Sequence, residues 1–198
     1  DNPSNLFCFT QKTDAGFRLN ISEVGVPKDQ AFKQTTQLSF QANDFPVALV
    51  CDDKYGCIFA VSKGGIISVH EIQSGKQLFT NQASKSTMFA NVNHAENGMI
   101  SIDLTGRVAQ FYIDEPNIVP YVCTVLNDLD LGVQMAKRYN LPGAEGLFIQ
   151  QFQRLMQAQR YVEAMQLAVS SPKGILRTLD TINQFKALPA NAGGGQPL

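Results

Sequence analysis

The chain has 198 residues, of which 44% are hydrophobic, and a formal net charge of −1. This composition is ordinary for a globular fold and provides no basic excess for binding nucleic acid or an anionic membrane surface. No apolar stretch approaches the roughly 18 to 20 residues of a membrane-spanning helix, and no signal-peptide pattern opens the chain. The four cysteines lie mostly inside apolar runs and lack CxxC spacing, so we expect reduced thiols in a reducing cytosol.

The first part of the chain, from Asn5 to Ile113, has the pattern of short antiparallel strands. Apolar and polar residues alternate in runs such as Cys57–Val61 and Ile66–His70, and glycine turns separate the runs. We expect about ten strands at hairpin spacing. They group into units of roughly 40 to 45 residues, which is the length of a four-stranded propeller blade.

One such unit is complete in the sequence and runs from Phe45 to Thr80. A partial unit precedes it, and another begins at Thr87 and runs out of strand pattern at Ile113. A closed propeller needs at least about four blades of four strands, because closure is what removes exposed sheet edges. The strands therefore predict a partial propeller, either a piece of a larger protein or one completed by a second chain fragment.

From Asn117 on, apolar residues recur at every third or fourth position, as in amphipathic helices. The expected stripes are Leu131, Met135 and Tyr139; Leu147, Phe148, Phe152 and Leu155; and Tyr161, Ala164, Met165 and Ala168. The expected apolar seam is Leu126, Leu131, Met135, Leu147 and Phe148. Pro116 and Pro120 are expected in the first turn of the first helix, where proline is tolerated. Short turns between the helices predict the first hairpins of an α-solenoid.

The predicted fold class is β then α. Residues 1–115 form the last blades of a propeller, and residues 116–198 form a helical linker that starts an α-zigzag or α-solenoid. The sequence ends in a glycine-rich segment, which is typical of a flexible connection.

The residue pattern does not support an enzymatic function. His70 and His94 are the only histidines, and neither has a cysteine, carboxylate or second histidine at ligand or triad spacing. Asp52 and Asp53 are typical of a hairpin turn, which is our interpretation of this pair. The sequence predicts no catalytic residue, no cofactor and no metal.

Several segments resemble the clathrin heavy chain family, at the junction between its propeller and its linker. They are Asn43–Ala48, Asn117–Tyr121, Leu141–Phe148 and Pro172–Thr178, in the same order as in that family. The resemblance implies the end of a seven-bladed propeller followed by the start of the α-zigzag. It implies a non-enzymatic coat protein of vesicle traffic, cytoplasmic and peripheral on coated pits and coated vesicles.

The same resemblance implies the partners. The propeller of the family binds short linear peptides of adaptor and accessory proteins, and the helical leg assembles with other heavy chains and with light chains. The best-known groove of the family lies between the first two blades and has no counterpart in these residues. A second groove lies between the fourth and fifth blades, and its half would fall on the hairpin Leu6 to Leu19.

The candidate peptide-binding residues on that hairpin are Leu6, Gln11, Lys12 and Arg18. For Leu6, burial in the blade core is the competing interpretation, since apolar strand residues are mostly buried. Two other hypotheses stay open. One is a different propeller-plus-solenoid scaffold of membrane traffic or nuclear transport. The other is a hydrolase built on a propeller, which would need polar residues converging at the central channel.

Overall fold

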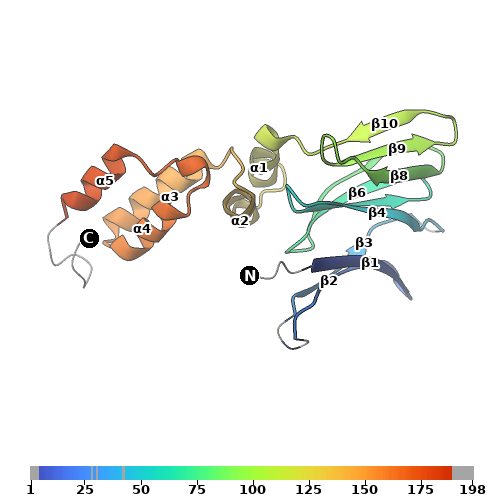
Figure 1. The fold of residues 1–198 in the computed structure, drawn as a ribbon, viewed down its shortest axis with the longest axis horizontal. Helices are drawn as coiled ribbons and strands as arrows, with labels where there is room; N and C mark the ends of the chain where they lie inside the picture. Colours follow the sequence, from blue (N-terminus) through green and yellow to red (C-terminus); the bar gives the residue numbers. More distant parts are fainter. Residues whose placement is uncertain (1–4, 28, 30, 42, 189–198) are drawn as a thin grey trace. The chain divides into compact units, whose positions relative to one another are not determined.

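The computed structural model describes residues 5–27, 29, 31–41 and 43–188. They fall into two compact units, Asp1–Ile113 and Asp114–Leu198. We call them the strand unit and the helical unit, and Figure 1 shows that strands occupy the first and helices the second. The change from period two to a helical period in the sequence lies close to the chain boundary between the two units.

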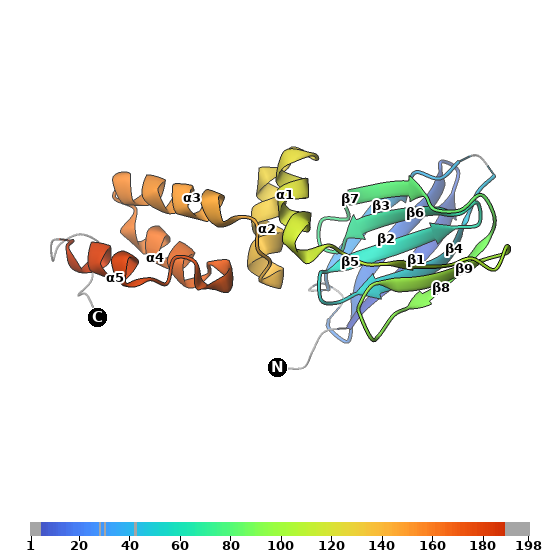
Figure 2. The ribbon, with the colours of Figure 1, turned by 90° about the horizontal axis from the view of Figure 1, so that it is seen from above.

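The described part of the strand unit contains ten strands in three antiparallel sheets (Figure 2). The first sheet has the order β1 (Asn5–Thr13), β2 (Gly16–Val24), β3 (Lys33–Leu38). The second has the order β4 (Pro46–Asp52), β5 (Cys57–Ser62), β6 (Ile66–Glu71), β7 (Gln77–Gln82). The third has the order β10 (Val108–Phe111), β9 (Met99–Asp103), β8 (Met88–Val92). One complete four-stranded blade between two incomplete ones confirms the predicted partial propeller.

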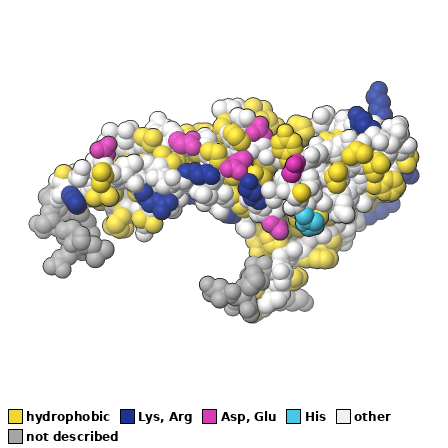
Figure 3. All heavy atoms as spheres, turned by 45° about the horizontal axis from the view of Figure 1, so that its top comes forward, with side chains coloured by type: hydrophobic (Ala, Val, Ile, Leu, Met, Phe, Trp, Pro, Cys, Tyr) yellow, Lys and Arg dark blue, Asp and Glu magenta, His cyan; other side chains and the backbone are white. Residues whose placement is uncertain are grey.

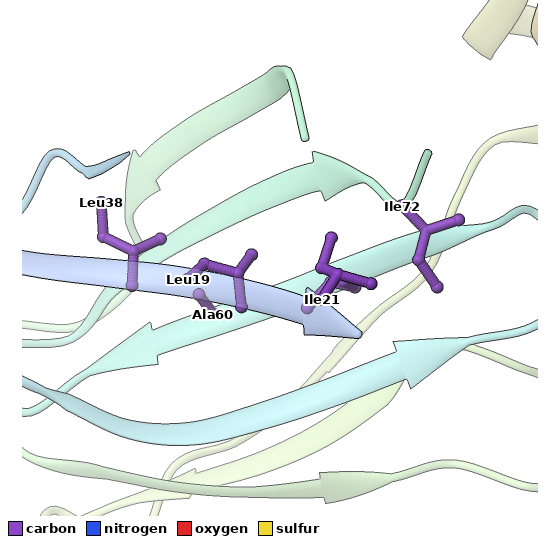
Figure 4. Close-up of a cluster of buried hydrophobic side chains, with 6 residues drawn as sticks. Leu19, Ile21, Leu38, Ala60 and Ile72 are labelled. Carbon is purple, nitrogen blue, oxygen red and sulfur yellow. The ribbon is translucent and has the colours of Figure 1, made fainter. Parts of the chain in front are cut away.

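The second sheet lies between the other two, so that both of its faces are covered. Every residue of β5 and β6 is buried, whereas β9 alternates between buried and exposed residues and the middle of β2 alternates between buried and half-buried residues. A core cluster joins the first and second sheets, and Figure 4 shows its side chains lying together between the strands. Its six buried members are Leu19, Ile21, Leu38, Ile58, Ala60 and Ile72. This burial of two apolar faces against each other is what holds neighbouring blades together.

β6 carries three buried polar side chains, Ser68, His70 and Glu71, and each of them makes hydrogen bonds. The Ser68 hydroxyl lies 2.8 Å from His70 Nε2, and His70 Nδ1 lies 3.2 Å from the carbonyl oxygen of Gly75. Glu71 accepts hydrogen bonds of 2.7 Å from both the N–H and the hydroxyl of Ser74. His70 therefore acts as a structural residue, with Nδ1–H donating to the carbonyl and Nε2 accepting from the hydroxyl.

Acid should destabilise the strand unit through His70. Burial lowers the pKa of His70, because the charged imidazolium is poorly solvated there. A histidine with a lowered folded pKa stabilises the fold above its unfolded pKa of about 6.5, and this contribution is lost as the pH falls further. We expect His70→Gln to remove a slope of up to about 1.4 kcal/mol per pH unit as the pH falls below about 6.5. Urea unfolding at several pH values measures it. His94→Gln in the exposed β8–β9 turn is the control, and an equal effect of both variants would contradict the assignment.

The helical unit contains five α-helices and one short 3₁₀ helix among the described residues. They are α1 (Glu115–Thr124), α2 (Leu129–Tyr139), α3 (Glu145–Gln157), α4 (Tyr161–Val169), η1 (Pro172–Gly174) and α5 (Leu179–Lys186). α1 packs on α2, and α3 packs on α4, as in solenoid hairpins. None of these helices is long and apolar enough to span a membrane.

Side-chain caps explain where two of these helices begin. Asp128 Oδ1 accepts from the Leu131 N–H at the start of α2, and Thr178 Oγ1 accepts from the Thr181 N–H at the start of α5. Each cap satisfies a backbone donor that the first helical turn leaves without a partner. Asn140 then ends α2 in the left-handed conformation.

The prediction for Pro120 is wrong, whereas Pro116 does lie in the first turn of α1. Pro120 lies inside the helix, where it cannot donate the hydrogen bond that the Pro116 carbonyl would otherwise accept. Its ring instead packs where a side chain of residue 143 would lie. A Cβ at Gly143 would come within 2.4 Å of Pro120 Cδ. The Leu141–Phe148 segment therefore contacts α1 through Gly143, which lies against the ring of Pro120.

The predicted apolar seam is confirmed in part. Leu131, Met135 and Phe148 are buried, whereas Leu126 and Leu147 are half-buried. Met165 was expected in the buried stripe of its helix but is 50% exposed. The stripe of α4 runs instead through Ala164, Leu167 and Ala168, which is the same period shifted by part of a turn.

Candidate functional site

The predicted site residues all lie on the β1–β2 hairpin, and the register of its strands decides which of them meet. Gln11 pairs with Arg18 across the two strands. Lys12 pairs with Phe17, and Leu6 pairs with Glu23. Cross-strand partners share a face, and successive residues of one strand lie on opposite faces.

The hairpin therefore separates the predicted residues into two pairs. Gln11 and Arg18 lie on the face directed away from the second sheet. Leu6 and Lys12 lie on the same face as Cys8, which packs against the core cluster. All four side chains are exposed, but Leu6 and Lys12 are six residues apart along β1, or about 20 Å. The structure thus brings the side chains of Gln11 and Arg18 together on one face of the hairpin. The side chains of Leu6 and Lys12 lie on the opposite face.

The outward face of the hairpin also carries two aromatic side chains. Phe7 is 57% exposed and Phe9 is 41% exposed, and their ring centroids lie 5.9 Å apart. We call Phe7, Phe9, Gln11 and Arg18 the hairpin face. It combines an apolar surface with an amide and a guanidinium, which are groups that can hold an extended peptide.

An unsatisfied donor lies next to this face. Asn20 pairs with Phe9 across the hairpin, and its Nδ2 is buried without a hydrogen-bond partner in the described structure. A buried unpaired amide costs about 1–3 kcal/mol. A polypeptide that covers the hairpin face could supply the missing acceptor.

The third sheet exposes an apolar face of its own. Phe89, Ile102 and Val108 are cross-strand neighbours on β8, β9 and β10, and each is largely exposed. We call these three residues the third-sheet face. Figure 3 shows hydrophobic side chains exposed over the strand unit. Large exposed apolar patches are typical of surfaces that bind a protein, a membrane or a ligand.

A cleft of about 410 Å³ lies between the second and third sheets, at the ends of β4 and β8. Asp52, which is only 4% exposed, lines it together with Asn91, Asn93 and His94. Asp52 Oδ1 accepts from the backbone N–H groups of Lys54 and Tyr55 in the β4–β5 turn. The turn that the sequence predicted at this position is confirmed.

The other oxygen of Asp52 was missed by the sequence analysis. Oδ2 is buried and has no hydrogen-bond partner in the described structure, although the Gly98 N–H approaches the carboxyl closely enough to favour its charged form. Burial outweighs these backbone donors and raises the pKa of Asp52. No sequence pattern signals it, because the third sheet buries the carboxyl. No group of three or more potential metal ligands occurs among the described residues.

Antiparallel blades with open apolar faces, followed by helical hairpins, define the class of propeller-plus-solenoid scaffolds. Two family profiles match the helical part of the chain. Residues 115–138 match "Clathrin, heavy-chain linker", and residues 140–198 match "Clathrin-H-link".

Whole-length relatives agree with these profiles. The chain is 39% identical to the clathrin heavy chain of Drosophila melanogaster over 98% of its length. It is 38% identical to clathrin heavy chain 2 of Homo sapiens over 99%, and 36% identical to clathrin heavy chain 1 of Arabidopsis thaliana over 100%. The chain is therefore a homologue of the clathrin heavy chain. It spans 12% of the length of each of these relatives.

Proposed function

We propose that this chain works as part of a clathrin coat protein in vesicle traffic and not as an enzyme. The observation that carries the proposal is the homology with clathrin heavy chains along both units, strands and helices alike. The fold supports it, since blades offer peptide-binding surfaces and helix pairs form a stiff leg. On this proposal the chain is cytoplasmic and lies on coated pits and coated vesicles.

We place the boundary between the two functional parts at residues 115 and 116, close to the boundary between the strand unit and the helical unit. Residues 1–115 contribute blades of a seven-bladed propeller that captures short linear peptides of adaptor and accessory proteins. Residues 116–198 begin the helical leg, which assembles with other heavy chains and, in the whole protein, with light chains. The helix pairs α1–α2 and α3–α4 support this role, because stacked helical hairpins propagate along one axis.

The open faces of the strand unit belong to the same proposal. The third-sheet face would be covered by a further blade, provided by a longer chain or by a second fragment, whereas the hairpin face stays open for a peptide. The apolar character of Phe89, Ile102 and Val108 supports a covering sheet, because cross-strand apolar residues are the usual contact between packed blades.

A peptide on the hairpin face would bind weakly. An extended peptide can place alternate side chains against Phe7 and Phe9 while Gln11 and Arg18 hold its polar groups. Contacts of this size give about 5–7 kcal/mol, which corresponds to micromolar to submillimolar dissociation constants. Many copies in one lattice then provide retention through multivalency.

The charge on the hairpin face should decide which peptides bind. We expect Arg18→Glu to weaken binding of a synthetic peptide with alternating leucine and aspartate residues by about tenfold, because an attraction becomes a repulsion. Lys12→Glu makes the same charge change on the opposite face and should alter the affinity less than twofold. Fluorescence anisotropy with the labelled peptide measures both.

A lysine version of the peptide, with every aspartate replaced, is the charge control and should bind Arg18→Glu better than the unchanged chain. Equal losses in Arg18→Glu and Lys12→Glu would show that only net charge matters. A loss confined to Lys12→Glu would move the site to the face of Leu6 and Lys12.

A further inference from the structure

Two cysteines from different sheets face each other across the interface between the first and second sheets. Cys8 on β1 pairs with Ile21, and Cys51 on β4 pairs with Ile58. Both isoleucines belong to the core cluster, and both cysteines pack against that cluster from its rim. β1 and β4 are themselves in contact.

The two thiols interact with each other. Both side chains are half-buried, so small oxidants can reach them, whereas Cys57 and Cys123 are buried. Residues of β1 and β4 approach within 8 Å between Cα atoms, and a disulfide needs Cα atoms about 4.4–6.8 Å apart, so only a small further approach of the two strands is required.

The surroundings also make one of the two thiols the better nucleophile. A hydrogen bond from Cys8 lowers the pKa of Cys51, while the same contact and burial raise the pKa of Cys8. Burial raises the pKa of Cys57 and of Cys123, so among the four cysteines only Cys51 gains thiolate character. Thiolate character and access decide which cysteine a peroxide oxidises first.

We propose that Cys8 and Cys51 form a reversible redox pair, which a hydroperoxide oxidises to a disulfide joining β1 to β4. The Cys51 thiolate attacks one peroxide oxygen, which breaks the O–O bond and gives a sulfenic acid and hydroxide. The Cys8 sulfur then attacks the sulfenic sulfur, and the oxygen leaves as water. In total two thiols and one hydrogen peroxide give one disulfide and two waters, so the sulfurs lose the two electrons that the peroxide gains.

The bond would fasten the first sheet to the second. β1 is an edge strand and carries the hairpin face, with Phe7 and Phe9 on either side of Cys8 in the sequence. Oxidation would therefore fix β1, which carries Phe7 and Phe9, against β4 of the second sheet. The inference does not depend on the proposed function, because it rests on the contact between two thiols.

The test treats the whole chain with hydrogen peroxide at neutral pH and then counts free thiols and maps peptides by non-reducing mass spectrometry. We expect the thiol count to fall from four to two, with a Cys8–Cys51 cross-linked peptide that disappears after reduction. The variant Cys57→Ser/Cys123→Ser should still form the bond. Cys8→Ala and Cys51→Ala should each form none.

Alkylation provides a second readout that does not need the bond. Iodoacetamide should modify Cys51 faster than Cys8 in the unchanged chain, and Cys8→Ala should slow the reaction at Cys51 because the hydrogen-bond donor is gone. The proposal is overturned if peroxide yields only mixed or intermolecular disulfides, or if Cys8 and Cys51 both stay reduced. Sulfinic acid at Cys51 with Cys8 unmodified would also overturn it.

Discussion

Replacing Gly65 by alanine should destabilise the strand unit by about 2–5 kcal/mol, a large effect for a single added methyl group. Gly65 has φ of +84°, and an added Cβ would lie 2.3 Å from the carbonyl oxygen of Ser84. The left-handed conformation costs an alanine about 1–2 kcal/mol, and the collision with backbone adds about 1–3 kcal/mol. The Gly65 carbonyl also accepts from the N–H groups of Ala83 and Ser84, so the neighbouring segment cannot move away freely.

Gly106 is the matched control for Gly65. It has φ of +82°, but an added Cβ would meet no atom within 4 Å. Gly106→Ala should therefore show only the conformational part, about 1–2 kcal/mol. Hydrogen exchange of the β5 and β6 peptides, followed by mass spectrometry, measures the loss. Equal protection in the two variants would mean that the Ser84 segment yields and that the packing around Gly65 is loose.

In the helical unit, Gly132→Ala should destabilise the α1–α2 pair by about 1–2 kcal/mol, although alanine favours helices. An added Cβ at Gly132 would lie 2.2 Å from Cys123 Sγ, so the helices would have to separate or Cys123 would have to change rotamer. The cost of this collision exceeds the gain of about 1 kcal/mol in helix propensity. Urea unfolding followed by far-UV circular dichroism measures the change.

Two further variants make the cause visible. Gly146 lies in α3, and an added Cβ there meets no atom within 4 Å, so Gly146→Ala should stabilise the helix by about 0.5–1 kcal/mol. Removing the Cys123 sulfur should rescue Gly132→Ala, because the remaining neighbours, the Val119 carbonyl oxygen at 3.7 Å and Cys123 Cβ at 3.8 Å, lie at ordinary contact distance. A double variant as unstable as Gly132→Ala alone would contradict the collision with Cys123.

The fold was predictable because both periods are strong in the sequence. The buried run of β5 and the alternation in β2 and β9 place strands correctly, since a period of two survives whatever packs on the sheet. Pro120 and Met165 were placed wrongly for tertiary reasons. Gly143, which lies in a turn outside α1, leaves room for the ring of Pro120. In α4 a rotation by part of a helical turn buries Leu167 and leaves Met165 exposed.

The candidate site was predictable only as a location. The sequence placed Lys12 beside Gln11, but neighbours along a strand point to opposite faces, and only the register joins Gln11 to Arg18. The unpaired oxygen of Asp52 and the contact of Cys8 with Cys51 both arise where two sheets meet. Such contacts between residues far apart in the chain leave no periodic signal.

The coat proposal is tested most directly by asking where the protein that carries this chain is found in the cell. Clathrin-coated vesicles would be purified from cells that make it, and its peptides would be quantified by mass spectrometry against those of adaptor subunits. We predict that its peptides co-purify with the coats in constant proportion to adaptors and leave the vesicles when the coats are disassembled. Peptides found in the cytosolic fraction and absent from coats would contradict the proposal.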